Sequence, residues 1–192
     1  MPKDHVVVGI DIGSSKVSTI IATIEGKTAN IIGVATHESR GLRKGQVVDI
    51  DEATASITES LEAAERMAGY SVGSAFVSVD GIHIESQNSK GVVAIGNPNG
   101  EIEESDVLRV VEAARAISLP SSREIMHVIP RYFVVDSQTG IKDPIGMTGV
   151  RLEVETHIIT GAATALRNIA KCVSQVGVDV QALVFSGLAS SY

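Results

Sequence analysis

The sequence predicts an α/β protein, because short β-branched runs alternate along the chain with segments of helical periodicity. The chain has 192 residues, of which 44% are apolar, and this is enough for one domain or two small lobes with real cores. Expected strands cover residues 6–12, 16–24, 29–35, 74–79, 124–137, 149–160 and 178–185. Residues 82–95 form either one bent strand or two.

Three amphipathic helices separate these strands. The first begins at Asp49 or Asp51, either of which can cap it, and ends at Gly69. The second has apolar residues at helical spacing from residue 107 and closes at Pro120, because proline cannot continue a helix. The third covers residues 166–176. The order is therefore β-β-β-α-β, then an inserted α/β segment, then α-β.

The opening strands have the pattern of an antiparallel meander with a tight loop at residues 13–15. Alternation places Val17, Thr19 and Ile21 on one face of the second strand. Residues 140–148 are expected to form a long loop between two later strands, since glycine and proline recur there. The strand at 178–185 is apolar on both faces, which predicts burial on both sides.

Composition excludes several classes of protein. A net charge of −7 argues against a protein whose main role is to wrap nucleic acid. The single cysteine, Cys172, excludes a disulfide framework and a structural zinc cluster, and is typical of a reducing compartment. No apolar run is long enough for a membrane span, and residues 1–5 do not begin a signal peptide. We therefore expect a soluble cytosolic protein.

The loop after the first strand carries the most chemistry. Gly13 permits close approach of a ligand, Ser14 and Ser15 add hydroxyl donors, and Lys16 adds a positive charge, which together suit a phosphate. Asp11, at the end of the strand, could hold the water shell of Mg²⁺. The spacing matches neither a Walker loop nor a dinucleotide-binding loop, and a tight glycine-serine hairpin also forms without any ligand.

Other polar residues have simpler interpretations. The five histidines are scattered without metal-ligand spacing, and no glycine-x-serine-x-glycine nucleophile motif is present. Cys172 is expected to be an inert small residue in a helix. Arg40, Arg43 and Lys44 could contact an acidic partner, but a solvated loop is the commoner explanation.

Several motifs in the same order resemble one family. The sequence DIGSSK at 11–16, between the first two strands of a β-β-β-α-β unit, resembles the first phosphate loop of the actin, Hsp70 and sugar-kinase superfamily. Within it, the chain resembles the bacterial cell-division family FtsA over essentially its whole length. The matching motifs are IIGV at 31–34, SRGLRKG at 39–45, HVIP at 127–130, GIKDPIG at 140–146, GVRL at 149–152 and GLASSY at 187–192.

The resemblance implies a fold and a site. It implies an actin-like, RNase H-like subdomain IA made of residues 1–81 and 161–192, with a smaller α+β subdomain IC of SHS2 type inserted at 82–160. By the same resemblance, Asp11 lies near Mg²⁺ and contacts it through water. Gly13, Ser14, Ser15 and Lys16 lie near the phosphates of ATP, with Ser15 and Lys16 at positions where members of the family differ.

The resemblance also implies a function. Proteins of this family bind ATP, self-associate into filaments at the inner face of the bacterial membrane, tether the FtsZ ring there and recruit later divisome proteins. On this basis we expect a cytoplasmic, membrane-associated protein at the division site that is not an enzyme, although a weak ATPase is possible in the full-length parent. Nucleic acid is not an expected partner.

The family's second phosphate loop, adenosine pocket and C-terminal membrane helix would lie beyond Tyr192. Residues 1–192 alone are therefore expected to bind ATP weakly or not at all, and to touch the membrane only through that later helix. Two alternatives remain open at this point. One is a PilM-like binding module of pilus assembly, and the other is a kinase of the same superfamily.

Overall fold

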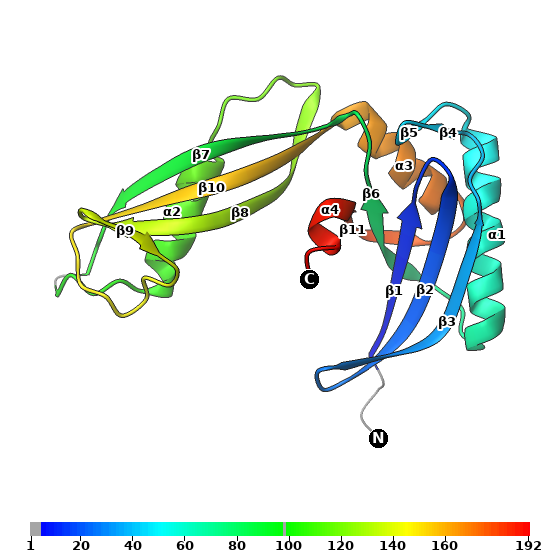
Figure 1. The fold of residues 1–192 in the computed structure, drawn as a ribbon, viewed down its shortest axis with the longest axis horizontal. Coiled ribbons are helices and arrows are strands. Elements are labelled where there is room, and N and C mark those ends of the chain that lie inside the picture. The colour runs from blue at the N-terminus through cyan, green and yellow to red at the C-terminus, as the bar shows by residue number, and fades with distance from the viewer. Residues whose placement is uncertain (1–4, 98) are drawn as a thin grey trace. The chain divides into compact units, whose positions relative to one another are not determined.

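The computed structural model describes residues 5–97 and 99–192, which form two compact units. Unit 1 comprises the chain up to Ile84 together with Gly161–Tyr192, and unit 2 comprises Glu85–Thr160 (Figure 1). The insertion predicted from the sequence covers residues 82–160. Because Thr160 Oγ1 donates to the carbonyl oxygen of Glu85 at 3.3 Å, the chain enters and leaves unit 2 at neighbouring points.

A five-stranded sheet forms the centre of unit 1, in the order β11-β6-β1-β2-β3. The strands are β1 (His5–Ile12), β2 (Lys16–Glu25), β3 (Thr28–Glu38), β6 (Ser74–Val79) and β11 (Asp179–Phe185). The first three are antiparallel neighbours, as the sequence predicts, whereas β6 is parallel to both β1 and β11. The mixed α/β fold class expected from the sequence is confirmed.

Two helices cover one face of this sheet. Helix α1 (Ile50–Ala68) packs on β2 and β3, and it contacts α3 (Ala163–Gln175), which packs on β11. Asp49 is the cap of α1, since its side chain accepts the Glu52 amide at 3.0 Å. The sheet residues that face these helices are fully buried and aliphatic or small, in agreement with the predicted alternation of β2. They include Ile10, Val17, Thr19, Ile21 and Val77.

Short elements complete unit 1. The polar segment after β3 folds into a two-stranded hairpin of β4 (Leu42–Arg43) and β5 (Gln46–Val47). A short helix, α4 (Ser186–Ala189), lies against β11 and β6.

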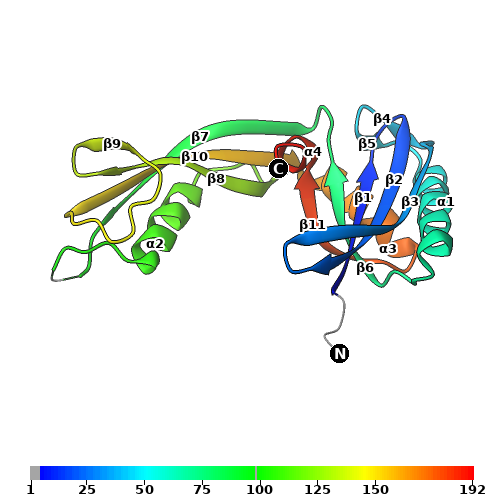
Figure 2. The same ribbon diagram turned by 60° about the horizontal axis from the view of Figure 1, so that its bottom comes forward.

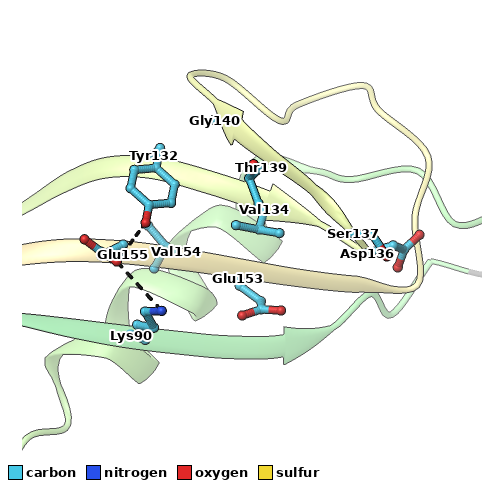
Figure 3. Close-up of a pocket in the computed structure, with 10 residues that line it drawn as sticks. All are labelled: Lys90, Tyr132, Val134, Asp136, Ser137, Thr139, Gly140, Glu153, Val154 and Glu155. Atoms are coloured by element: carbon cyan, nitrogen blue, oxygen red, sulfur yellow. Dashed lines mark hydrogen bonds and ion pairs between the residues drawn. The ribbon is translucent and has the colours of Figure 1, made fainter.

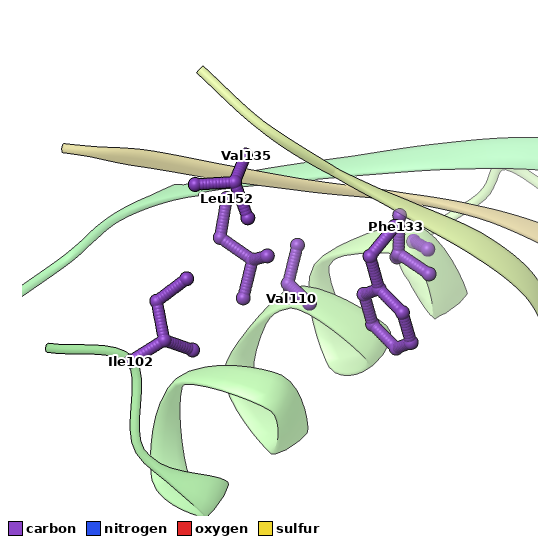
Figure 4. Close-up of a cluster of buried hydrophobic side chains, with 7 residues drawn as sticks. Ile102, Val110, Phe133, Val135 and Leu152 are labelled. Atoms are coloured by element: carbon purple, nitrogen blue, oxygen red, sulfur yellow. The ribbon is translucent and has the colours of Figure 1, made fainter. Parts of the chain in front are cut away.

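Unit 2 is a four-stranded sheet covered on one face by one helix (Figure 2). The strand order is β7-β10-β8-β9, with β7 (Ile84–Ala94), β8 (Arg123–Val135), β9 (Gln138–Ile141) and β10 (Arg151–Ala162). Helix α2 (Glu104–Arg115) supplies Val110 and Ala114 to a core completed by residues of the strands and the preceding loop (Figure 4). These are Ile102, Phe133, Val135, Leu152 and Val154. Unit 2 therefore has a hydrophobic core of its own.

The structure differs from three sequence-based expectations. Helix α2 ends at Arg115, not at Pro120, because the proline ring would collide with the carbonyl of residue 116. The predicted loop at 140–148 begins inside a strand, since β9 pairs with β8 through Ile141 and Phe133. Strand β11 is an edge strand whose residues are exposed or half-buried, so it is not covered on both faces. Residues 82–95 contain one strand, β7.

Candidate functional site

The loop between β1 and β2 lies at the carboxyl end of β1 and is open to solvent. Ser14, Ser15 and Lys16 are exposed, and Gly13 is half-buried. Asp11 is half-buried on β1, where it pairs with Ser18 of β2 and Ser78 of β6. A carboxylate and two hydroxyl residues therefore occupy one row across three strands, next to the loop.

Hydrogen bonds fix the shape of this loop. The Gly13 amide donates to the Lys16 carbonyl at 3.0 Å, and the Ser15 carbonyl accepts the Ser39 amide at 3.1 Å. Across the described parts of the chain, the amides of Ser14 and Ser15 donate to no backbone carbonyl. These two amides, and not that of Gly13, can therefore donate to a ligand.

A cleft of about 600 Å³ opens beside the loop, entirely within unit 1. Three segments line it: the end of β1 with its loop, the turn between β4 and β5, and the residues that follow β6. The lining residues are Ile12, Gly13, Ser14, Lys44, Gly45, Asp80, Gly81 and Ile82. Of the five residues proposed from the sequence, this cleft brings together Gly13 and Ser14, whereas Asp11, Ser15 and Lys16 lie outside its lining.

Sequence reasoning missed the second and third of these segments. For Lys44 the sequence favours a solvated loop over contact with an acidic partner, and it predicts no functional role for Asp80 or Gly81. The available signal was a pair of glycines, Gly45 and Gly81, each beside a charged residue. Their meeting depends on long-range packing, which no local pattern encodes.

The turn between β4 and β5 and the residues that follow β6 make close backbone contacts. A Cβ atom on Gly45 would overlap the carbonyl oxygen of Asp80 and would lie 2.6 Å from the Cα of Gly81. The Ile82 amide donates to the Lys44 carbonyl at 3.2 Å, and the Gly45 amide donates to Ser14 Oγ at 2.8 Å. We call this set of contacts between residues 14, 44–45 and 80–82 the glycine clamp.

The donors and acceptors at this cleft suit a polyphosphate with a hydrated divalent cation. Backbone amides, a serine hydroxyl and a lysine ammonium group favour phosphate oxygens. Magnesium prefers one or two carboxylates and retains several waters. Asp11 is the last but one residue of β1, and Asp80 follows the end of the neighbouring parallel strand β6. Gly45 and Gly81 allow the two backbone segments that line one side of the cleft to approach each other closely.

A second pocket, of about 540 Å³, lies on the sheet of unit 2 (Figure 3). Its central group is the Glu155 carboxylate, which accepts from Tyr132 Oη and Arg131 Nη1, both at 2.8 Å, and lies 3.8 Å from Lys90 Nζ. The hydrogen bond to Glu155 raises the pKa of Tyr132, and burial and the carboxylate charge act in the same direction. The lining is therefore polar and internally paired.

Two other side chains have pKa values shifted from their ordinary ones. Burial raises the pKa of the Cys172 thiol, which keeps it protonated and agrees with the inert role expected from the sequence. Burial also lowers the pKa of His127 on β8. Across residues 5–97 and 99–192, no helix is both long and apolar enough to cross a bilayer.

Comparison with known proteins identifies the family. The chain is 47% identical over 189 residues to the cell division protein FtsA of Borreliella burgdorferi, which covers 98% of this chain and 46% of the relative. The chain belongs to the FtsA family of cell-division proteins. The FtsA of Bacillus subtilis is 42% identical over 190 residues, 99% of this chain and 43% of the relative. The chain thus spans about half the length of these FtsA proteins.

The inserted unit has its own match within the FtsA family. Residues 81–160 match the family described as "SHS2 domain inserted in FTSA". Among solved structures, the PilM-PilN type IV pilus biogenesis complex is similar in fold, with a TM-score of 0.62 at 15% identity over 97% of this chain and 49% of that chain. The family resemblance derived from sequence motifs is confirmed.

Proposed function

We propose that this chain is the part of an FtsA-type protein that holds the phosphates of ATP with Mg²⁺. The observation that carries the proposal is the convergence of Gly13 and Ser14, Lys44 and Asp80 on one cleft at the carboxyl edge of the sheet. Ser14 and Ser15 would donate to phosphate oxygens, and Asp11 would hold Mg²⁺ through its water shell. Bound Mg²⁺ would neutralise phosphate charge, and the protein residues would bind and orient the nucleotide.

We further propose that the complete protein self-associates into filaments at the cytoplasmic face of the membrane and tethers FtsZ at the division site. Support comes from the 37–47% identity to FtsA proteins of several bacteria. Unit 2 would carry contacts with later divisome proteins, since it presents a polar sheet face with an open pocket. The protein would act through assembly, with at most a weak ATPase in the full-length form.

A chimera tests this function in a complete protein. This chain would replace the matching segment of the Bacillus subtilis FtsA, and binding of Mg-ATP and co-sedimentation with FtsZ on lipid vesicles would be measured. We expect Asp11→Asn to weaken Mg-ATP binding about tenfold or more, because the metal loses a charged partner. Asp51→Asn, the same change on an exposed first turn of α1, is the control and should bind normally. Equal binding by both variants would contradict the proposed metal role.

A partner-binding module without nucleotide is the second candidate. The bond from the Gly45 amide to Ser14 Oγ favours it, because it gives the serine a structural reason to be present. If the chain is such a module, the Asp11→Asn chimera should recruit FtsZ as well as the unmodified chimera does. If the proposed ATP-dependent function is right, the Asp11→Asn chimera should bind nucleotide more weakly and should also recruit less FtsZ.

A further inference from the structure

We propose that Lys44 is a phosphate-binding residue of the cleft and that the glycine clamp positions it. This inference rests on the proposed nucleotide function and adds a residue that the loop motif does not contain. The ligand chemistry is that of a pyrophosphate group, as found in ADP and ATP.

The backbone of Lys44 is the first argument. Its φ of 53°, together with the φ of 76° at Gly45, is what a two-residue hairpin of type I′ requires between β4 and β5, where Arg43 pairs with Gln46. This turn places Lys44 at the tip of the hairpin, where it lines the cleft with Ser14. Its backbone is held through its carbonyl, which accepts from Ile82.

The distribution of charge is the second argument. Three cations lie close together in the sequence, at 40, 43 and 44. Arg40 is paired with Glu59, and Arg43 lies on β4 outside the lining of the cleft. Lys44 lines the cleft beside Gly13 and Ser14, and within the described chain it has no ion pair. Of these three cations, Lys44 is the one that can serve a phosphate bound at the loop.

The serine hydroxyl is the third argument. Ser14 Oγ accepts the Gly45 amide, so its own hydrogen remains available to donate to a phosphate oxygen. The same bond fixes the turn that carries Lys44 against the loop that carries Ser14. Ser14 and Lys44 therefore line one cleft of about 600 Å³, a size typical of small-ligand sites.

The test is a nuclear magnetic resonance titration of the 192-residue chain, in which weak binding is measurable from amide shifts. Inorganic pyrophosphate and Mg-ATP are added in separate experiments, into the millimolar range. We expect both to shift the amides of Ser14, Ser15 and Gly45. Lys44→Gln keeps the aliphatic stem and should raise both dissociation constants about tenfold, whereas Lys44→Arg should stay within about threefold of the unmodified chain.

Arg43→Gln is the matched control, since it removes the same charge one residue away and should change neither constant. The role of Lys44 is overturned if Lys44→Gln and Arg43→Gln weaken binding equally, or if Lys44→Gln does not weaken it. In either case the nucleotide proposal stands if Mg-ATP still shifts the amides of Ser14 and Ser15. Lys44-dependent binding of pyrophosphate with no effect of Mg-ATP supports Lys44 and contradicts the nucleotide function. No shift with either probe overturns the role of Lys44, whereas Mg-ATP binding by the chimera decides the nucleotide proposal.

The positioning role of the clamp has a separate readout. Gly45→Ala should weaken pyrophosphate binding to the level of Lys44→Gln, because the new methyl group displaces the turn from Asp80. Its amide spectrum should change at Ser14 and Ile82 and stay the same in unit 2. Unchanged pyrophosphate affinity in Gly45→Ala would overturn the clamp as a positioning device.

Discussion

At the scale of single residues, Glu155 organises the exposed sheet face of unit 2, because its carboxylate bonds both Tyr132 and Arg131. We expect Glu155→Gln to lower the pKa of Tyr132 toward its ordinary value, since ionising the tyrosine would no longer place two negative charges side by side. Ultraviolet absorbance during an alkaline titration measures this pKa. Glu153→Gln is the control, because Glu153 pairs with Arg151 instead, and it should leave the titration unchanged.

A glycine on β7 sets the approach of α2 to the sheet. A Cβ atom on Gly91 would lie 2.6 Å from the Ala114 amide nitrogen, whereas one on Gly96 would meet nothing closer than Arg109 at 3.9 Å. Gly91→Ala should therefore lower the free energy of unfolding by about 1–3 kcal/mol, and Gly96→Ala should change it by less than about 0.5 kcal/mol. Urea unfolding of both variants measures the difference, and equal stability would show that α2 shifts without cost.

The candidate site was predictable where the chemistry lies in consecutive residues. The Asp11 and Gly13–Lys16 segment is visible in the sequence because a strand end, a glycine and two serines are adjacent. The structure adds Lys44, Gly45 and Asp80, which come from separate elements. These three residues come together through a backbone contact between Gly45 and Gly81. Glycine has no side chain, so no pattern in the sequence predicts such a contact.

At the scale of elements, helix α2 depends on an acidic residue in its first turn. The buried Asp106 carboxylate accepts the Glu103 amide at 3.0 Å and pairs with Arg109. The hydrogen bond from the Glu103 backbone, followed by that from Arg109, holds the pKa of Asp106 below its ordinary value. The ionised carboxylate therefore stabilises the fold.

We expect Asp106→Asn to lower the free energy of unfolding by about 1–2 kcal/mol at neutral pH. A lowered folded pKa means that this stabilisation is fully present above the unfolded value, near 3.8, and is lost as the pH falls through the folded value. The difference between the two proteins should thus shrink below about pH 4. Urea unfolding across that range measures it, with the exposed first-turn change Glu104→Gln as control. A difference that stays constant with pH would contradict the role of the ionised form.

Element types followed from periodicity, whereas their ends and partners did not. The end of α2 was misplaced because the apolar spacing continues to Ile117. The ring of Pro120 already disfavours helix one turn earlier, at residue 116. Strand β9 was missed because its four residues are too short for a period to be recognised. Strand β11 was expected to be covered on both sides, yet its position at a sheet edge is a property of topology.

At the scale of the whole molecule, the strand and helix order predicted the antiparallel meander of unit 1 and an α/β insertion, but not the order of all five strands. The parallel pairing of β6 with β1 and of β11 with β6 joins segments far apart in the chain, and no local pattern encodes it. The inserted unit was recognisable from its separate run of strands and one helix. Which residues close its core, such as Ile102 from a loop, required the structure.

Unit 2 should fold as an isolated fragment of residues 82–161. Its core is built from its own residues, Ile102 to Val154, and its ends are joined by the bond between Thr160 Oγ1 and the Glu85 carbonyl. Because the two ends of the insertion lie next to each other, the surrounding chain is not needed to keep them together. We expect cooperative urea unfolding and dispersed amide resonances from this fragment.

The complementary construction replaces residues 85–160 with a short glycine-serine linker. Unit 1 should keep its five-stranded sheet, because the Ala162 amide donates to the His83 carbonyl at 3.2 Å and so holds the two chain ends together beside the linker. The amide resonances of β1, β2 and β6 report on that sheet. Loss of those resonances, or a fragment 82–161 without dispersed amide resonances, would mean that each unit needs the other in order to fold. Each unit would then have its own hydrophobic core without being stable by itself.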